Sequence, residues 1–195
     1  MADHSHARRT ARPAAALWRR VDDPGHDAAR LEPGDGGWLL RGVAVFNHRG
    51  EPACLGYAVD LDDTWATRSA EVHGFLGARS IDHSIARVDG HWIHNGVKAQ
   101  GLSHLVDIDF GFTPATNLQQ LRRVALRVGQ EVELPVAWLN VDSVELAELP
   151  QHYRRLSETE YDYDAPSVSY HAVLTLAANG FASRYPTGWE MECAS

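Results

Sequence analysis

Two aspartates stand one residue apart in "VDIDFGF", residues 106–112, and this spacing could support acid–base chemistry. If the segment is an extended strand, side chains two residues apart lie on the same face, about 7 Å from each other. Asp107 and Asp109 could then act as the general acid and general base of an enzyme. The alternative is an amphipathic strand that turns both carboxylates toward water.

The arginines of two neighbouring segments favour a buried polar cluster over an exposed one. If "LRRVALRV", residues 121–128, is a strand, alternation places Arg122 on the face of its valine and leucine side chains. The same alternation places Arg68 on the apolar face of "WATRSAEV". A buried guanidinium without a partner would cost several kcal/mol. We therefore expect Arg122 to pair with Asp107 or Asp109, and we expect Arg122→Ala to unfold the protein or abolish ligand binding.

The sequence favours neither a metal site nor a familiar catalytic motif. The spacing of His91 and His94 puts the two imidazoles on opposite faces of a strand, which is poor geometry for chelation. Cys54 and Cys193 form neither a zinc pattern nor a disulfide framework. The chain has no GxSxG elbow and no glycine-rich phosphate loop. We expect no metal and no cofactor.

Charge and hydropathy restrict the partners and the location. The 195 residues carry a formal net charge of −8 with a pI near 5.7, which disfavours nucleic acid and anionic membrane surfaces. No apolar run is long enough to span a membrane, and the N-terminal segment lacks the apolar core of a signal peptide. We expect a cytoplasmic protein without integral membrane contact; the sequence predicts no particular oligomeric state.

Turn signals between strand-like runs indicate antiparallel β-structure. Positive-φ turn sequences stand at residues 47–50, at Asp89-Gly90 and at Asn179-Gly180. Residues 141–163, "VDSVELAELPQHYRRLSETEYDY", look helical, with Pro150 dividing them into two short pieces. Residues 1–13 are polar, basic and rich in alanine and proline, which predicts a disordered tail. The remaining 14–195 predict one mainly β domain, an antiparallel roll, open barrel or sandwich with a short helical insertion.

A series of short motifs runs along the chain in a fixed order. They are Gly37-Trp38, Tyr57, Asp60, Trp65, Arg68, Asp89-Gly90, Trp92, Asp107, Asp109, Pro114, Thr116-Asn117, Arg122-Arg123, Gln151, Tyr153, Tyr161, Tyr163, Gly180 and Tyr185-Pro186. In this order and spacing, from residue 18 to residue 186, the chain resembles the bacterial family of putative glycolipid-binding proteins. The resemblance implies a single-domain spiral β-roll, similar to bacterial carriers of lipoproteins and lipids whose curved sheet encloses an apolar cavity.

The resemblance and the arginine argument together suggest a non-enzymatic binding module for a small amphipathic ligand, a lipid or a glycolipid. The polar rim of its cavity would comprise Arg68, Asp107, Asp109, Asn117, Arg122, Tyr153 and Tyr185. Trp38 and Trp65 would supply apolar or stacking contacts. Two alternatives stay open: an enzyme of unknown reaction that uses Asp107 or Asp109 as acid or base, and a structural or interaction module with no small ligand.

Overall fold

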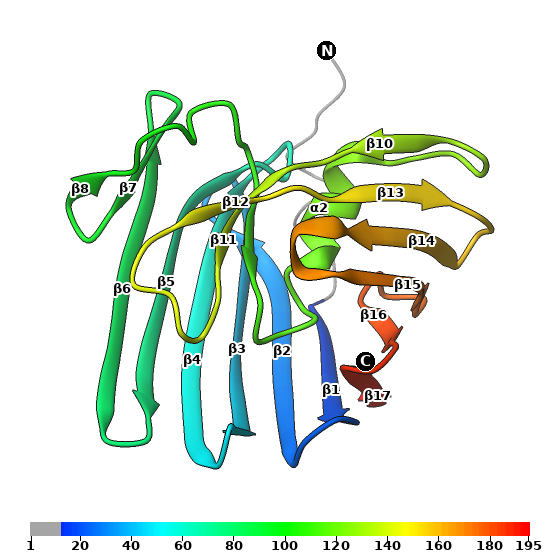
Figure 1. Ribbon diagram of the computed structural model, residues 1–195. Coiled ribbons are helices and arrows are strands. Elements are labelled where there is room, and N and C mark those ends of the chain that lie inside the picture. Colours follow the sequence, from blue (N-terminus) through cyan, green and yellow to red (C-terminus); the bar gives the residue numbers. More distant parts are fainter. Residues whose placement is uncertain (1–12) are drawn as a thin grey trace.

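The computed structural model describes residues 13–195, so the predicted tail falls almost wholly outside the described residues. The described residues form a mainly β structure with a fourteen-stranded antiparallel sheet that curves around a filled interior (Figure 1). Its first eight strands follow one another as a meander: β1 Ala14–Arg20, β2 Gly25–Gly34, β3 Gly37–His48, β4 Glu51–Asp62, β5 Thr67–Leu76, β6 Arg79–Val88, β7 His91–His94 and β8 Val97–Lys98.

Residues 152–194 form a second meander that joins the first. Its strands are β13 His152–Arg155, β14 Glu160–Ala165, β15 Tyr170–Leu176, β16 Ala182–Tyr185 and β17 Trp189–Ala194, with the 3-10 turn η1 Pro166–Val168 before β15. Strand β17 pairs with β1, and Ala15 and Ser195 exchange backbone hydrogen bonds of 3.1 and 3.0 Å. The two ends of the described chain therefore meet inside the sheet. Strand β10, Glu131–Glu133, forms one edge of the sheet and β8 forms the other, so the sheet stays open.

The segment between the two meanders fills the concave side of the sheet. It contains the helix α2 Asn117–Val124 and a small sheet of β9 Ile108–Phe110, β11 Val136–Leu139 and β12 Ala147–Leu149. Strand β9 is tied to β5 by a hydrogen bond from the Ile108 amide to Thr67 Oγ1, 3.1 Å. The helix is tied to β9 by Gln119, whose Nε2 donates to the Ile108 carbonyl at 2.8 Å. These bonds fix the inserted elements relative to the sheet.

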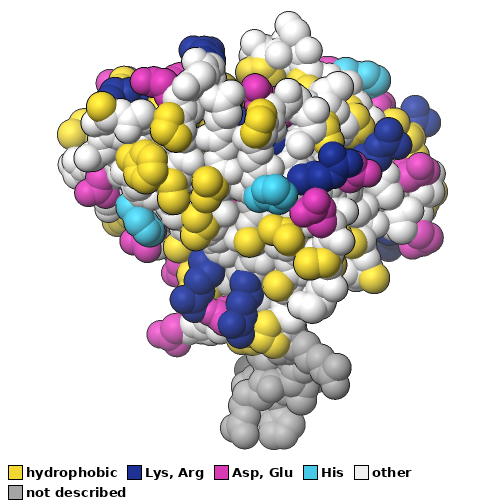
Figure 2. Space-filling view, turned by 90° about the horizontal axis from the view of Figure 1, so that it is seen from below, with side chains coloured by type: hydrophobic (Ala, Val, Ile, Leu, Met, Phe, Trp, Pro, Cys, Tyr) yellow, Lys and Arg dark blue, Asp and Glu magenta, His cyan; other side chains and the backbone are white. Residues whose placement is uncertain are grey.

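Two hydrophobic clusters hold the layers together. The larger packs the inner faces of β1–β6, including Trp18 and Leu40, against Phe110 of β9 and Leu139 of β11. The smaller packs Leu121 of α2 against tyrosines of β13 and β14. The face shown in Figure 2 carries both acidic and basic side chains, spread over the surface. Hydrophobic side chains are more frequent toward the left of this view. Among the described residues, no helix has the length and apolar character to cross a membrane.

The three turn sequences were correct predictions, whereas the helical assignment was wrong. Turns join β3 to β4, β6 to β7 and β15 to β16 at the predicted positions, and Asp89 and Gly90 both have positive φ, 50° and 76°. Residues 141–163, predicted as helical, instead form β12, β13 and part of β14. Alternate burial of tyrosines on β13 and β14 overrides the helix-favouring glutamates and leucines. The described helix lies at 117–124, where Leu118 and Leu121 are buried at helical spacing.

Candidate functional site

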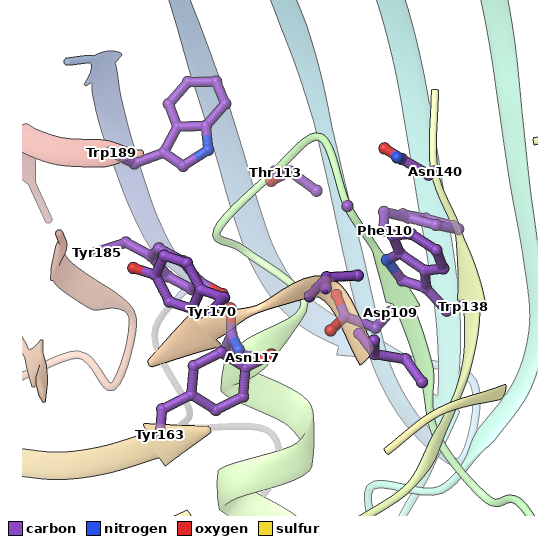
Figure 3. A pocket seen from close by; sticks show the side chains of 13 residues that line it. Asp109, Phe110, Thr113, Asn117, Trp138, Asn140, Tyr163, Tyr170, Tyr185 and Trp189 are labelled. Atoms are coloured by element: carbon purple, nitrogen blue, oxygen red, sulfur yellow. The ribbon is translucent and has the colours of Figure 1, made fainter. Parts of the chain in front are cut away.

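A pocket of about 300 Å³ opens where the inserted small sheet faces the second meander (Figure 3). Its lining residues come from β9, β11, β12, α2, β14, η1, β15, β16, β17 and two connections: Asp109, Phe110, Gly111, Thr113, Asn117, Trp138, Asn140, Leu149, Tyr163, Val168, Tyr170, Tyr185 and Trp189. No pair of neighbouring strands could form it alone. The volume is at the lower end of the range for small-ligand pockets.

Tyrosine and tryptophan side chains form one wall of the pocket. The rings of Tyr170 and Tyr185 are stacked, with centroids 5.1 Å apart and an interplanar angle of 25°. The Tyr163 ring packs against both, 5.8 Å from Tyr170 and 5.9 Å from Tyr185. Trp189 lies beside this group in Figure 3. Burial raises the pKa of all three tyrosines, that of Tyr170 to about 12, so their hydroxyls are neutral at physiological pH.

The opposite wall combines an indole with amide and carboxyl groups. Trp138 and Asn140 face the tyrosine wall across the pocket (Figure 3). They approach the backbone closely at Gly111, where an added Cβ would lie 2.9 Å from both Asn140 Oδ1 and Trp138 Nε1. A glycine at this position therefore lets the indole and the amide close this wall.

Asp109 supplies the single carboxyl group among the lining residues. Its Oδ1 accepts a hydrogen bond from Thr116 Oγ1 and its Oδ2 accepts one from Gln151 Nε2, each 2.6 Å long. The side chain is 6% exposed, and its desolvation raises the pKa above the usual value against the opposing hydrogen bonds. None of the described arginines forms an ion pair with Asp109 within 4.0 Å. Burial therefore favours the protonated form of Asp109, and its hydroxyl and amide partners offset this only in part.

Asn117 continues this polar network at the first residue of α2. Its Nδ2 donates to the Tyr153 hydroxyl at 2.8 Å, and that hydroxyl donates to Gln120 Oε1 at 3.2 Å. Tyr153 itself is fully buried behind the pocket and packs on Tyr163, with ring centroids 4.7 Å apart. Thr116 does not cap the helix with its side chain, because its hydroxyl is used by Asp109 and the Phe110 amide. The network thus orients the helix relative to β9.

A second buried carboxyl group, Asp27, lies next to the pocket behind Thr113. Asp27 is 0% exposed and accepts hydrogen bonds from the Tyr57 hydroxyl, at 3.0 and 3.1 Å, and from Thr113 Oγ1. Burial raises its pKa to about 7. Our sequence reasoning missed this residue, although strand alternation in "HDAARL" puts it on the same face as Ala29 and Leu31, which are buried.

The predicted site residues separate into groups in the structure. Asp109, Asn117 and Tyr185 line the pocket, and Tyr153 supports it from behind. Asp107 is buried but outside the lining; it forms a bidentate ion pair with Arg123, whose Nε and Nη2 donate over 2.9 and 2.6 Å. The expected pairing of Arg122 with Asp107 or Asp109 was therefore wrong: the partner of Asp107 is the next residue, Arg123.

The prediction that Arg68 and Arg122 point inward was wrong. Arg122 lies on a helix and not on a strand, so strand alternation does not apply, and its side chain is exposed. Arg68 occupies a β-bulge, because Asp60 pairs with Ser69 while Leu61 pairs with Thr67. The extra residue shifts the alternation, and Arg68 turns outward to donate to the carbonyls of Asp35 and Gly36 at 2.8 and 3.2 Å.

Trp38 and Trp65 lie together but away from the pocket. Their rings stack at 4.8 Å with an interplanar angle of 13°, and Arg122 lies over the Trp65 ring at 5.9 Å. Both indoles are partly exposed. These two tryptophans and Arg122 therefore form a separate cluster from the aromatic pocket.

The described residues contain no group of three or more His, Cys, Asp or Glu side chains placed to hold a metal ion. His94 contacts His83 rather than His91, with His83 Nδ1 2.8 Å from His94 Nε2. Both imidazoles are buried, and desolvation lowers both pKa values. The two neutral imidazole rings therefore form a hydrogen bond with each other.

The fold is that of a mainly β protein whose curved sheet has its concave face filled by α2 and the small sheet. Its pocket is lined by both aromatic and polar side chains. The chain belongs to the family described as "Putative glycolipid-binding", whose model matches residues 15–191. It is also similar to a solved structure, that of a DUF1089 family protein from Pseudomonas aeruginosa. The two are 25% identical, the match covers 92% of each chain, and the TM-score is 0.68. No curated protein matches the chain.

Proposed function

We propose that the pocket binds the uncharged, polyhydroxylated head group of a small amphipathic molecule, such as a glycolipid, without chemical turnover. The observation that carries the proposal is the lining itself. It combines tyrosine and tryptophan rings with amide, hydroxyl and carboxyl groups, and none of its residues is a lysine, arginine or histidine. Aromatic rings stack on the apolar faces of sugars, while neutral polar groups pair with their hydroxyls.

The absence of a cation among the lining residues argues against an anionic head group. A phosphate or sulfate in this pocket would lie beside Asp109 without a guanidinium or ammonium group to offset its desolvation. A sugar hydroxyl, by contrast, can donate to the Asp109 carboxyl and accept from the Asn140 or Asn117 amide. The chemistry of the lining therefore favours a neutral ligand.

The apolar part of the ligand has its exit beside Val168. The concave side of the sheet is filled by α2 and the small sheet, and the pocket is of head-group size. Val168 is a lining residue of the 3-10 turn η1 and is 44% exposed, which places it where the pocket meets solvent. An acyl or alkyl chain attached to the head group would therefore leave the pocket past this turn.

Binding explains the carboxylates better than catalysis does. The sequence suggested Asp107 and Asp109 as an acid–base pair, but Asp107 lies outside the lining and is engaged by Arg123. Two-carboxylate hydrolysis requires both groups to face one substrate. Since Asp109 is the single carboxyl group among the lining residues, it is better suited to accept or donate a ligand hydrogen bond.

Blocking the mouth of the pocket should weaken binding without unfolding the protein. We expect Val168→Trp to reduce the affinity for octyl glucoside, a neutral alkyl glycoside, at least tenfold in isothermal titration below the micelle concentration. The indole would occupy the entrance, and Val168 makes no side-chain hydrogen bond that the substitution could break. Val173→Trp is the matched control, because Val173 is similarly exposed, at 40%, but does not line the pocket.

Equal affinities for the two variants, with unchanged melting temperatures, would place the glycoside outside this pocket. Failure of the wild-type protein to bind octyl glucoside, octyl maltoside and octyl galactoside would remove the proposal as a whole.

A further inference from the structure

We infer that a groove between α2 and the ends of β14 and β15 is a second ligand site, one that binds the carboxylate of a single-chain amphiphile through Arg122. The groove has a volume of about 400 Å³. It shares no lining residue with the aromatic pocket. The inference is therefore independent of the function proposed above.

The floor of the groove is apolar. Helix α2 contributes Leu118, Leu121 and Ala125, and the sheet side contributes Tyr161, Leu176 and Ala177. Leu118, Leu121 and Tyr161 are already buried, whereas Leu176 and Ala177 are partly exposed. Ala125 and Ala178, which also lines the groove, are exposed, so an alkyl chain would cover these four side chains and remove them from water. Arg122 lies at its margin, so an apolar surface and a cation border the same space.

Three contacts hold the Arg122 guanidinium in place. Its Nη2 donates to the Asn179 carbonyl at 3.1 Å, and its central carbon lies 5.9 Å from the centre of the Trp65 ring. It also passes directly over Gly180, where an added Cβ would be only 2.7 Å from Nη2. A guanidinium held in this way loses little conformational entropy when it binds a ligand.

The platform beneath Arg122 is itself fixed by an unusual backbone conformation. Trp65 has a φ of 72°, which is rare for a bulky residue. The Asp62 carboxylate stabilises this turn by accepting from the amides of Thr64 and Ala66 at 2.7 and 3.0 Å. The Trp65 indole then stacks on Trp38 on one side and contacts Arg122. Arg122 thus rests on a rigid support.

Arg122 has hydrogen-bonding capacity to spare. Within residues 13–195 no acidic side chain forms an ion pair with it, and its one protein hydrogen bond uses one of five N–H donors. Arg155, the other arginine of the groove, instead donates to the carbonyls of Ser157, Leu126 and Glu158. The available charge is therefore the guanidinium fork of Arg122, whose geometry matches a carboxylate.

The charge balance of the groove favours a singly charged ligand. Glu158 also lines it, and the whole chain has a formal net charge of −8. Glu158 is paired with Arg155 at 3.1 Å, so the lining has one cation without an acidic partner among the described residues, Arg122, and a single carboxylate matches this charge. We therefore assign the groove to a fatty-acid-like carboxylate.

The test is a titration of the full chain with dodecanoate below its micelle concentration, followed by tryptophan fluorescence and isothermal titration. The wild-type protein should bind, with a change in emission because Trp65 contacts Arg122. Arg122→Gln should weaken binding at least tenfold, and Ala178→Trp should do the same by filling the groove. Arg154→Gln is the control, since Arg154 is an exposed arginine that does not line the groove. Melting temperatures establish that each variant is folded.

Two further probes make the assignment specific. Dodecanol, which has the same chain without the charge, should bind at least tenfold more weakly than dodecanoate. Binding of dodecanoate should persist in Val168→Trp, and any binding of octyl glucoside should persist in Arg122→Gln. Unchanged dodecanoate affinity in Arg122→Gln, loss of dodecanoate binding in Val168→Trp, equal affinity for dodecanol, or no binding to the wild type would each overturn the inference. Failure of octyl glucoside alone would count only against the function proposed for the aromatic pocket.

Discussion

Replacing Arg123 with alanine is expected to lower the free energy of unfolding by about 3–5 kcal/mol, because it leaves the Asp107 carboxylate buried without its partner. Asp107 is 0% exposed, and its desolvation raises its pKa against the opposing effect of Arg123. Arg123 closes the pair in a bidentate geometry from the last turn of α2. Urea denaturation at pH 7 measures the loss.

Arg122→Ala is the matched control, one residue away on the same helix. Its side chain is exposed and its guanidinium meets a carbonyl and a ring face but no carboxylate within 4.0 Å among the described residues, so we expect a change of less than about 1 kcal/mol. The sequence alone had suggested the reverse, with Arg122 as the indispensable residue. Equal losses in the two variants would show that the ion pair with Asp107 does not have the assigned role.

The second large effect concerns Asp27 and depends on pH. The pKa of this carboxyl is raised from 3.8 to about 7 in the folded protein. Between those two values the folded state holds a proton that the unfolded state has lost, so stability falls as the pH rises through this window. Roughly three pKa units correspond to a loss of about 4 kcal/mol when the pH is well above 7.

Asparagine at this position should remove that pH dependence, because it resembles the neutral acid in size and polarity but does not ionise. We expect Asp27→Asn to be no more stable than the wild type at pH 4.5 and more stable than the wild type at pH 8.5. Denaturant midpoints across this range give the difference between the two proteins, which cancels the titration of other groups. Asp23→Asn, at an exposed aspartate, serves as the control. A wild-type and variant difference that stays constant with pH would contradict the assignment.

Local turn chemistry explains why much of the sheet could be predicted from the sequence. Asp89-Gly90 specifies a tight two-residue turn whatever the rest of the chain does, and its flanking strands follow from it. Asn179-Gly180 also marks a turn, but it lies within the longer connection 177–181 between β15 and β16. The location of the helix could not be predicted in this way. Residues 117–124 contain short apolar spacing that suits either element, and burial of Leu118 and Leu121 against distant strands decides between them.

The candidate site was partly predictable for a related reason. Asp109, Asn117, Tyr153 and Tyr185 were identified from motifs, and they converge at the pocket. Trp138, Asn140, Tyr170 and Trp189 carry no local signal, because only the folded sheet brings them to the same space. Arg68 was misplaced through the bulge between β4 and β5, which no alternation pattern reveals. The alternation of side chains between the two faces of a strand predicts the wrong face wherever a bulge adds one residue.

The central proposal is that the aromatic pocket receives a neutral sugar head group. The most direct measurement is a crystal structure of the protein grown with octyl glucoside. We predict a glucose ring beside Tyr185 and Trp189, with its hydroxyls within hydrogen-bonding distance of Asp109 and Asn140 and its alkyl chain leaving past Val168. A glucoside bound elsewhere on the protein while this pocket stays free of it would contradict the account.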